Sequence, residues 1–299
     1  MKESYTSKIA DVVIGGTDGV SEVTLGKKRP LAFILGPCAI ESEDHSMFMA
    51  DKISDICQRN NVSWIFKSCF DKDCRSSVDS FHGLGLDGLE ILAKVRKEFG
   101  VPVISDYSDP SWAKPTGEVC DLVQIPAYLC RQTTMLRAGA ETGKPIHLKK
   151  GQFMSPWNMK NSVRKLENFG CDQILLTDRG TTFGYNMLVN DMTCLPIMNS
   201  TGYPVCYDAT HSIQLPTSMG NISGGQREFI PYLVRGSVAL GVQAIFMEVH
   251  NNPSEALSDG NTVLDLKYLE NIIKQALIVH EMRQEILENF GDDEVHLND

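Results

Sequence analysis

The chain has 299 residues, of which 42% are hydrophobic and 22% are charged, and this composition is typical of a soluble globular protein. Its formal net charge is −10, and a net-acidic chain without a long basic block is not expected to be a general nucleic-acid binder. We see no apolar run near the roughly 18 residues that span a bilayer, and no signal-peptide core. Nine dispersed cysteines favour reduced thiols and a cytoplasmic location.

The first predicted element is a β-hairpin. Residues 11–25 alternate between apolar and polar side chains on both sides of the glycine-rich turn Gly15–Gly19. Such alternation around a turn is typical of two antiparallel strands. We expect an N-terminal extension, residues 1–30, whose hairpin caps the N-terminal end of the following domain.

Eight short apolar runs follow, and their β-branched residues favour buried strands. They are Leu31–Leu35, Val62–Phe66, Val101–Ile104, Leu122–Ile125, Ile146–Leu148, Gln173–Leu176, Val205–Tyr207 and Ala244–Val249.

Amphipathic stretches with helical spacing separate most of these runs. The clearest are Asp44–Gln58, Gly88–Glu98, Asn158–Phe169, Glu228–Leu240 and the closing stretch Asp265–Phe290. Between the third and fourth runs, Pro110 and Pro115 leave room for only a short helix. This alternation predicts one α/β domain, a (β/α)8 TIM barrel over residues 31–290, rather than an open doubly wound sheet. Residues 291–299 would form an acidic tail.

Reactive side chains follow the predicted strands, where (β/α)8 barrels carry their chemistry. Seven of them are cations: Lys67, Lys72, Arg75, Arg131, Lys149, Lys150 and Arg179. A single surface cation is usually only solvated. A ring of them around one barrel mouth suits a substrate with two anionic groups, phosphate or carboxylate.

A second set has the chemistry of a metal site. It consists of Cys38, His211, Glu248 and Asp259, which follow the first, seventh and eighth strands. These strands are neighbours in a closed barrel. Mixed sulfur, nitrogen and oxygen ligands suit a divalent ion such as Zn²⁺, Fe²⁺ or Mn²⁺. The alternative is a structural histidine and a buried cysteine.

Taken in order, the loops after the strands resemble those of the 3-deoxy-D-manno-octulosonate 8-phosphate synthase family. The resemblance runs from about residue 31 to residue 283. The motifs that carry it include Gly36-Pro37-Cys38-Ala39-Ile40-Glu41-Ser42, Phe70-Asp71-Lys72, Arg75-Ser76-Ser77, Gln124-Ile125-Pro126-Ala127, Cys130-Arg131-Gln132-Thr133, Lys149-Lys150-Gly151-Gln152-Phe153, Arg179-Gly180-Thr181-Thr182, Asp208-Ala209-Thr210-His211-Ser212, Phe246-Met247-Glu248 and Leu257-Ser258-Asp259.

The resemblance implies a cytoplasmic transferase, usually a homotetramer, that joins phosphoenolpyruvate to arabinose 5-phosphate and releases phosphate. It implies three groups of site residues. Those expected around phosphoenolpyruvate are Lys67, Lys72, Gln124, Lys149 and Arg179. Those expected at the aldose phosphate are Cys69, Cys74, Arg75, Ser76, Asp106 and, from a neighbouring subunit, Arg131. Cys38 indicates the metal-dependent class, with His211, Glu248 and Asp259 as the other ligands and His211 also catalytic.

The departures from the family pattern concentrate at the aldose. Cys74 stands where the family has Asn, Cys69 where Ser is common, and Tyr107-Ser108-Asp109 where Val-His-Glu is expected. The acceptor sugar is therefore the least determined part of the prediction. Alternatives are a 3-deoxy-arabino-heptulosonate 7-phosphate synthase, whose Lys-Pro-Arg loop is absent here, another phosphoenolpyruvate-dependent synthase of the sialic-acid type, and a catalytically inert barrel that only binds.

Overall fold

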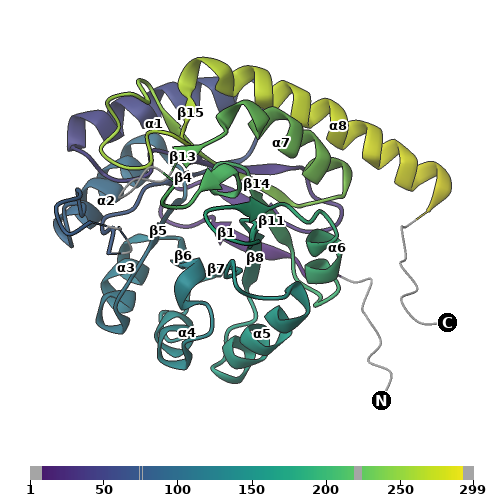
Figure 1. Ribbon diagram of the computed structural model, residues 1–299, viewed down its shortest axis with the longest axis horizontal. Helices are drawn as coiled ribbons and strands as arrows, with labels where there is room; N and C mark the ends of the chain where they lie inside the picture. The colour runs from purple at the N-terminus through teal and green to yellow at the C-terminus, as the bar shows by residue number, and fades with distance from the viewer. Residues whose placement is uncertain (1–8, 74, 76, 219–223, 292–299) are drawn as a thin grey trace.

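The computed structural model describes residues 9–73, 75, 77–218 and 224–291, and its centre is a closed barrel of eight parallel strands (Figure 1). The last strand pairs with both the seventh and the first, which closes the ring and confirms the predicted (β/α)8 barrel. The strands are β3 (Ala32–Gly36), β4 (Trp64–Lys67), β5 (Val103–Asp106), β6 (Leu122–Ile125), β7 (Ile146–Lys149), β8 (Ile174–Asp178), β11 (Val205–Asp208) and β14 (Ala244–His250).

Burial on both faces explains why these strands read as continuous apolar runs. Alternate side chains point into the barrel, among them Ile34, Ile104 and Phe246. The others, such as Phe33 and Ile245, pack outward against the helices. Each predicted run coincides with an observed strand to within one or two residues, so the strands were predictable from apolar periodicity alone.

The helices surround the barrel (Figure 1). They are α1 (Glu43–Arg59), α2 (Asp87–Phe99), α3 (Ala113–Val119), α4 (Thr133–Ala140), α5 (Met159–Asn168), α6 (Cys194–Asn199), α7 (Ile230–Ala239) and α8 (Leu269–Phe290). Short 3₁₀ turns are η1 (Pro110–Trp112), η2 (Ala127–Leu129), η3 (Pro156–Asn158), η4 (His211–Ile213), η5 (Arg227–Phe229) and η6 (Leu266–Tyr268). Helix α3 is short, as its prolines predict.

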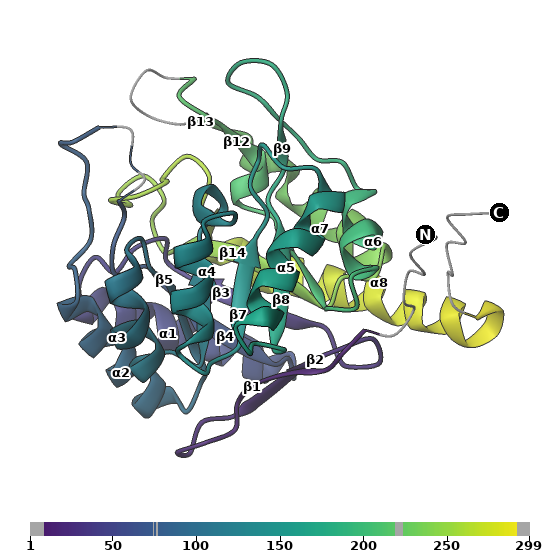
Figure 2. The same cartoon turned by 90° about the horizontal axis from the view of Figure 1, so that it is seen from below.

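The N-terminal hairpin covers the amino ends of the barrel strands (Figure 2). Its strands β1 (Val12–Gly15) and β2 (Glu22–Leu25) are antiparallel. The four inward side chains, Val12, Ile14, Val23 and Leu25, are buried and join the inner barrel side chains in one apolar cluster. The hairpin is therefore the predicted cap.

Short strand pairs decorate the loops at the opposite end. β9 (Thr181–Thr182) pairs with β10 (Leu188–Val189), β12 (Gln214–Leu215) pairs with β13 (Gly224–Gly225), and β15 (Leu264–Asp265) extends alongside β14. These segments form the rim above the carboxyl ends of the strands (Figure 2). Within the described ranges, none of the helices has the length and apolar character that a membrane crossing requires.

Candidate active site

A cavity of about 600 Å³ opens at the carboxyl ends of the barrel strands. Most of the predicted site residues lie on its wall: Lys67, Cys69, Lys72, Arg75, Asp106, Gln124, Lys149, Arg179, His211 and Asp259. Cys38 and Glu248 are buried beside it, and Arg131 is exposed and is not part of this wall. Cys74 and Ser76 lie outside the described residues.

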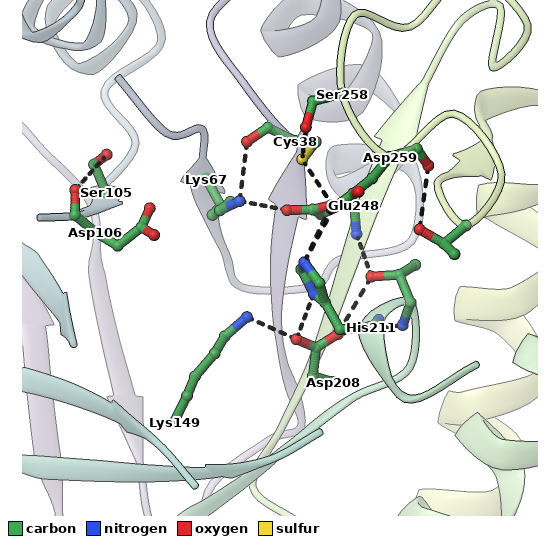
Figure 3. A network of polar contacts seen from close by, with 12 residues as sticks. Cys38, Lys67, Ser105, Asp106, Lys149, Asp208, His211, Glu248, Ser258 and Asp259 are labelled. Atoms are coloured by element: carbon green, nitrogen blue, oxygen red, sulfur yellow. Dashed lines mark hydrogen bonds and ion pairs between the residues drawn. The ribbon is translucent and has the colours of Figure 1, made fainter. Parts of the chain in front are cut away.

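The four predicted metal ligands come together from three strand ends (Figure 3). Ligand atoms of Cys38, Glu248 and Asp259 all lie within 4.8 Å of one another, and Cys38 Sγ is 3.5 Å from Asp259 Oδ2. His211 Nε2 lies 3.5 Å from Glu248 Oε2 and 3.8 Å from Asp259 Oδ2. Three of the four donors thus form one compact group, and His211 Nε2 lies beside its two carboxylates.

The hydrogen bonds around this group suit a divalent cation. His211 Nδ1 is 2.7 Å from Asp208 Oδ2. Because an ionised carboxylate can only accept, Nδ1 carries the proton and the Nε2 lone pair is left for a cation. Glu248 Oε2 is buried without a hydrogen-bond partner in the described structure. An orphaned buried oxygen beside a free imidazole nitrogen fits a metal such as Zn²⁺, Fe²⁺ or Mn²⁺.

Asp208 was not among the predicted site residues, yet it joins two of them. It ends β11, is fully buried, and accepts from Lys149 Nζ at 2.7 Å as well as from His211. Burial alone would raise the pKa of Asp208, but His211 and Lys149 hold it well below its usual range. The signal was present in the sequence, because Asp208 begins the motif that contains His211.

Lys67 lies on the cavity wall and contacts the metal-type group, as we call Cys38, His211, Glu248 and Asp259 together. Its Nζ donates to Glu248 Oε1 at 2.5 Å and to the carbonyl oxygen of Cys38 at 3.1 Å. Burial opposes the charge of Lys67, but Cys69 and Glu248 outweigh it and hold the pKa above its usual value. Burial likewise opposes the Glu248 charge, and His211 and Lys67 hold that pKa below its usual range. Both groups are therefore charged at neutral pH.

The opposite wall presents buried polar atoms to the cavity. Gln124 Oε1, Gln152 Oε1 and Arg179 Nη1 have no hydrogen-bond partner in the part of the chain that the structure describes. Arg179 is held by its other nitrogen, because Nη2 donates to Gln214 Oε1 at 2.5 Å. Buried polar groups are rarely left unpaired, so these atoms mark where a polar ligand would bind.

The remaining cations separate by position. Lys150 is fully buried and pairs with Asp178 at 3.2 Å, so it does not line the predicted ring. Arg227, which was not among the predicted site residues, also lies on the wall, and its guanidinium donates to the carbonyl oxygen of Gly260. Arg75 Nη1 donates to Ser258 Oγ at 2.7 Å and lies 3.4 Å from Asp259 Oδ1.

The structure also brings together a second group of metal-ligating residue types, which does not line the cavity. Ligand atoms of Glu41, His45 and His250 lie within 4.8 Å of one another. However, His250 Nδ1 accepts from the Asn252 amide at 3.0 Å, so its Nε2 carries the proton and faces Glu41 at 3.3 Å. A protonated nitrogen cannot bind a metal. This group instead anchors the chain, because Glu41 also accepts from the Leu257 amide at 2.9 Å.

The fold and the cavity together define the class: a (β/α)8-barrel protein whose strand ends present cations beside a cysteine, a histidine and two carboxylates. The chain belongs to the DAHP synthetase I family, whose family model matches residues 8–288.

Similar proteins bear a single name. A Cyanothece protein is 53% identical over 259 residues, which cover 86% of this chain and 95% of the relative. Proteins from Protochlamydia amoebophila and a Geobacter species are each 49% identical over 266 residues, which cover 89% of this chain and 97% and 95% of those relatives. All three are named 2-dehydro-3-deoxyphosphooctonate aldolase.

Proposed function

We propose that this chain condenses phosphoenolpyruvate with arabinose 5-phosphate to give 3-deoxy-D-manno-octulosonate 8-phosphate and inorganic phosphate. The observation that carries the proposal is one cavity lined by lysines and arginines, with His211 and Asp259 on its wall and Cys38 and Glu248 buried beside it. The name that the similar proteins share supports the choice of product.

Phosphoenolpyruvate would occupy the part of the cavity that is lined by Lys67, Lys72, Gln124, Lys149 and Arg179. Its phosphate and carboxylate carry negative charge throughout the reaction. Fixed cations that need no reorganisation stabilise such charge most effectively. Lys67 remains protonated, because its pKa lies above the usual value, so it acts as a cation and not as a Schiff-base nucleophile.

Cys38, His211, Glu248 and Asp259 would hold a divalent ion, with Zn²⁺, Fe²⁺ and Mn²⁺ as the candidates. When bound, such an ion supplies Lewis-acid chemistry: it would polarise the aldehyde oxygen of the sugar or position a water molecule. Asp208 orients His211, and Lys67 holds one oxygen of Glu248, so the protein directs both ligands from outside.

The reaction requires carbon 3 of the enol phosphate to attack the aldehyde carbon. Water then adds at carbon 2, and the resulting tetrahedral centre expels phosphate by cleavage of its C–O bond. Arg179 presents Nη1 to the cavity and is held through Nη2, so it can stabilise the phosphate without moving as the reaction proceeds. Its role is electrostatic, and no covalent bond to the protein is needed.

The aldose phosphate would bind towards Cys69, Arg75 and Asp106, with Cys74 and Ser76 in the same loop. Asp71, which lies in this loop next to Lys72, accepts a hydrogen bond from Ser108 at 2.6 Å. Erythrose 4-phosphate stays the second candidate acceptor, because the matching family model bears the DAHP name.

Phosphate release from phosphoenolpyruvate tests the proposal. We expect release with arabinose 5-phosphate that is faster than with erythrose 4-phosphate, and loss of release after chelation of divalent metal. Faster release with erythrose 4-phosphate would favour the second candidate. The absence of release with either aldose would refute the proposed condensation and leave a binding protein.

The same proposal includes a homotetramer in the cytoplasm, with residues 31–290 as one catalytic domain. Large apolar side chains are exposed near the rim, among them Phe183 (68%), Tyr185 (97%) and Tyr232 (64%). Aromatic side chains are enriched in protein interfaces relative to the rest of the surface. Arg131 does not line the cavity of its own chain, which fits a role in a neighbouring subunit. Light scattering gives the mass in solution, and a monomer would contradict this part.

A further inference from the structure

Ser258 occupies the junction between the metal-type group and the arginine on the aldose side. It lies in the loop after β14, next to Asp259, and is only 2% exposed. Its Oγ is 3.1 Å from Cys38 Sγ and 2.7 Å from Arg75 Nη1 (Figure 3 shows the contact with Cys38). One hydroxyl group therefore touches both halves of the site.

We propose that Ser258 is a positioning residue that couples the cation-binding group to the binding of the aldose phosphate through Arg75. This inference rests on the proposed function, because it assigns Arg75 to the sugar phosphate and Cys38 to the cation. We therefore expect a change at Cys38 to alter the placement of Arg75, and a change at Arg75 to alter the placement of Cys38.

Competition for Asp259 explains why Arg75 needs this contact. Arg75 Nη1 also lies near a carboxylate oxygen, Asp259 Oδ1, at the longer distance of 3.4 Å. Asp259 Oδ2 already faces Cys38 Sγ at 3.5 Å and His211 Nε2 at 3.8 Å. If Asp259 binds the cation, Ser258 remains as the group that keeps Arg75 directed into the cavity.

A hydroxyl group is suited to this position because it both donates and accepts. In this structure the Cys38 thiol and Arg75 both donate to Ser258 Oγ. A metal-bound thiolate can only accept. The Ser258 hydroxyl then donates to Sγ, while its lone pairs still accept from Arg75. Ser258 therefore connects Cys38 to Arg75 in both states. Alanine can do neither.

The loop holds Ser258 from both sides. Before it, the Leu257 amide donates to Glu41 Oε1 at 2.9 Å. After it, Asp259 has a φ of 53°, in the left-handed region that few residues with a side chain adopt, and its carbonyl accepts from the Thr262 amide at 2.8 Å. The position of the Ser258 side chain is therefore set by the loop, while its hydroxyl hydrogen can still rotate.

The decisive experiment compares Ser258→Ala with Ser258→Thr, which retains the hydroxyl, on the cobalt-loaded full-length protein. We expect arabinose 5-phosphate to shift the thiolate-to-cobalt absorption band in the wild type and in Ser258→Thr, but not in Ser258→Ala. The KM for arabinose 5-phosphate should rise at least about tenfold in Ser258→Ala, as for loss of a hydrogen bond to a charged group, while the KM for phosphoenolpyruvate stays within about twofold.

A double-mutant cycle separates positioning from a general structural effect. If Ser258 acts through Arg75, Ser258→Ala should add little to the rise in KM that Arg75→Ala already causes. Additive effects, or an unchanged band shift in Ser258→Ala, would overturn the coupling.

The coupling is testable even if the proposed function fails. Binding of inorganic phosphate, measured by calorimetry, can replace the KM as the readout of Arg75. Loss of phosphate affinity in Ser258→Ala, retained in Ser258→Thr, would support Ser258 as the coupling residue without any turnover. Equal phosphate affinity in all three proteins would refute it.

Discussion

Lys67 and Glu248 form an ion pair that is almost completely removed from solvent: Nζ lies 2.5 Å from Oε1, and the side chains are 1% and 0% exposed. The pair uses one oxygen of Glu248 and leaves Oε2 without a hydrogen-bond partner among the described residues. A buried pair of this kind adds little net stability, because desolvation offsets the attraction. What the pair provides is a fixed direction for the second oxygen.

Removing one partner should therefore be costly. In metal-free protein, we expect Glu248→Gln to lower the free energy of unfolding by about 3–5 kcal/mol, because Lys67 is left buried without its counter-charge. Urea unfolding measures this. The matched control is Glu43→Gln, which breaks a half-exposed pair with Lys94 of similar length, 2.7 Å, and should cost less than about 1 kcal/mol. Equal effects of the two substitutions would contradict the argument.

Two buried carboxyl groups of the site contribute to the pH dependence of stability. The pKa values of Glu248 and Asp208 lie below their ordinary values of 4.5 and 3.8. A group whose pKa is lowered by folding stabilises the fold above its unfolded pKa, and this contribution is lost as the pH falls. The free energy of unfolding should decrease as the pH falls below the ordinary value of 4.5 for Glu248.

Unfolding curves from about pH 7 to about pH 3 would measure that decrease. The slope should be shallower in Glu248→Gln than in the wild type, because one of the contributing groups has been removed. An unchanged slope would place the acid sensitivity elsewhere in the molecule.

Cys38 should be required for metal binding. We expect Cys38→Ser to lower Co²⁺ affinity by more than about 100-fold and to abolish the thiolate-to-cobalt band, since loss of an outer-shell partner alone costs about 10–100-fold. Optical titration measures both. Cys171→Ser is the control, because Cys171 is also buried and its thiol donates to the carbonyl oxygen of Gln173, at 3.6 Å, as a serine hydroxyl can. A band that survives in Cys38→Ser would assign the thiolate to another cysteine.

Asp208→Asn should weaken metal binding without touching a ligand. The amide no longer fixes the proton on His211 Nδ1, so we expect Co²⁺ affinity to fall by about 10–100-fold. Chelator competition is the measurement. Wild-type affinity in this variant would show that His211 is oriented by other contacts.

The hairpin cap should contribute stability but not catalysis. We expect Ile14→Ala to cost about 2–5 kcal/mol, because Ile14 is fully buried against the barrel interior. Val13→Ala, at a position 42% exposed in the same strand, should change stability by less than about 0.5 kcal/mol. Both variants should keep the wild-type KM for phosphoenolpyruvate. A raised KM in Ile14→Ala would show that the cap also shapes the site.

The sequence predicted the barrel because each buried strand left an apolar run and each loop a polar cluster. It was less informative about direction. Lys149 and Lys150 are adjacent in the chain, yet Lys149 faces the cavity while Lys150 pairs with Asp178 outside it. Side chains alternate along a strand, so one of two neighbours had to point away, and only the barrel register decides which one.

Contacts between distant loops were the part that could not be predicted. Ser258 and Cys38 are 220 residues apart, and although both stand in motifs read from the sequence, nothing in those motifs predicts that the two side chains meet. The same holds for Arg227, whose place on the wall depends on the path of the segment after β13. Asp208 is intermediate, since its spacing of three residues from His211 was visible but its role required the 3₁₀ turn that folds one towards the other.

The hairpin at the amino end of the barrel also has a consequence for the order of events. With that end filled by Val12, Ile14, Val23 and Leu25, ligands reach the cavity from the rim at the carboxyl ends of the strands. A ligand bound near the rim would then block the way to the deeper part of the cavity. We therefore expect the two substrates to bind in a fixed order, which kinetics with one ligand withheld would reveal.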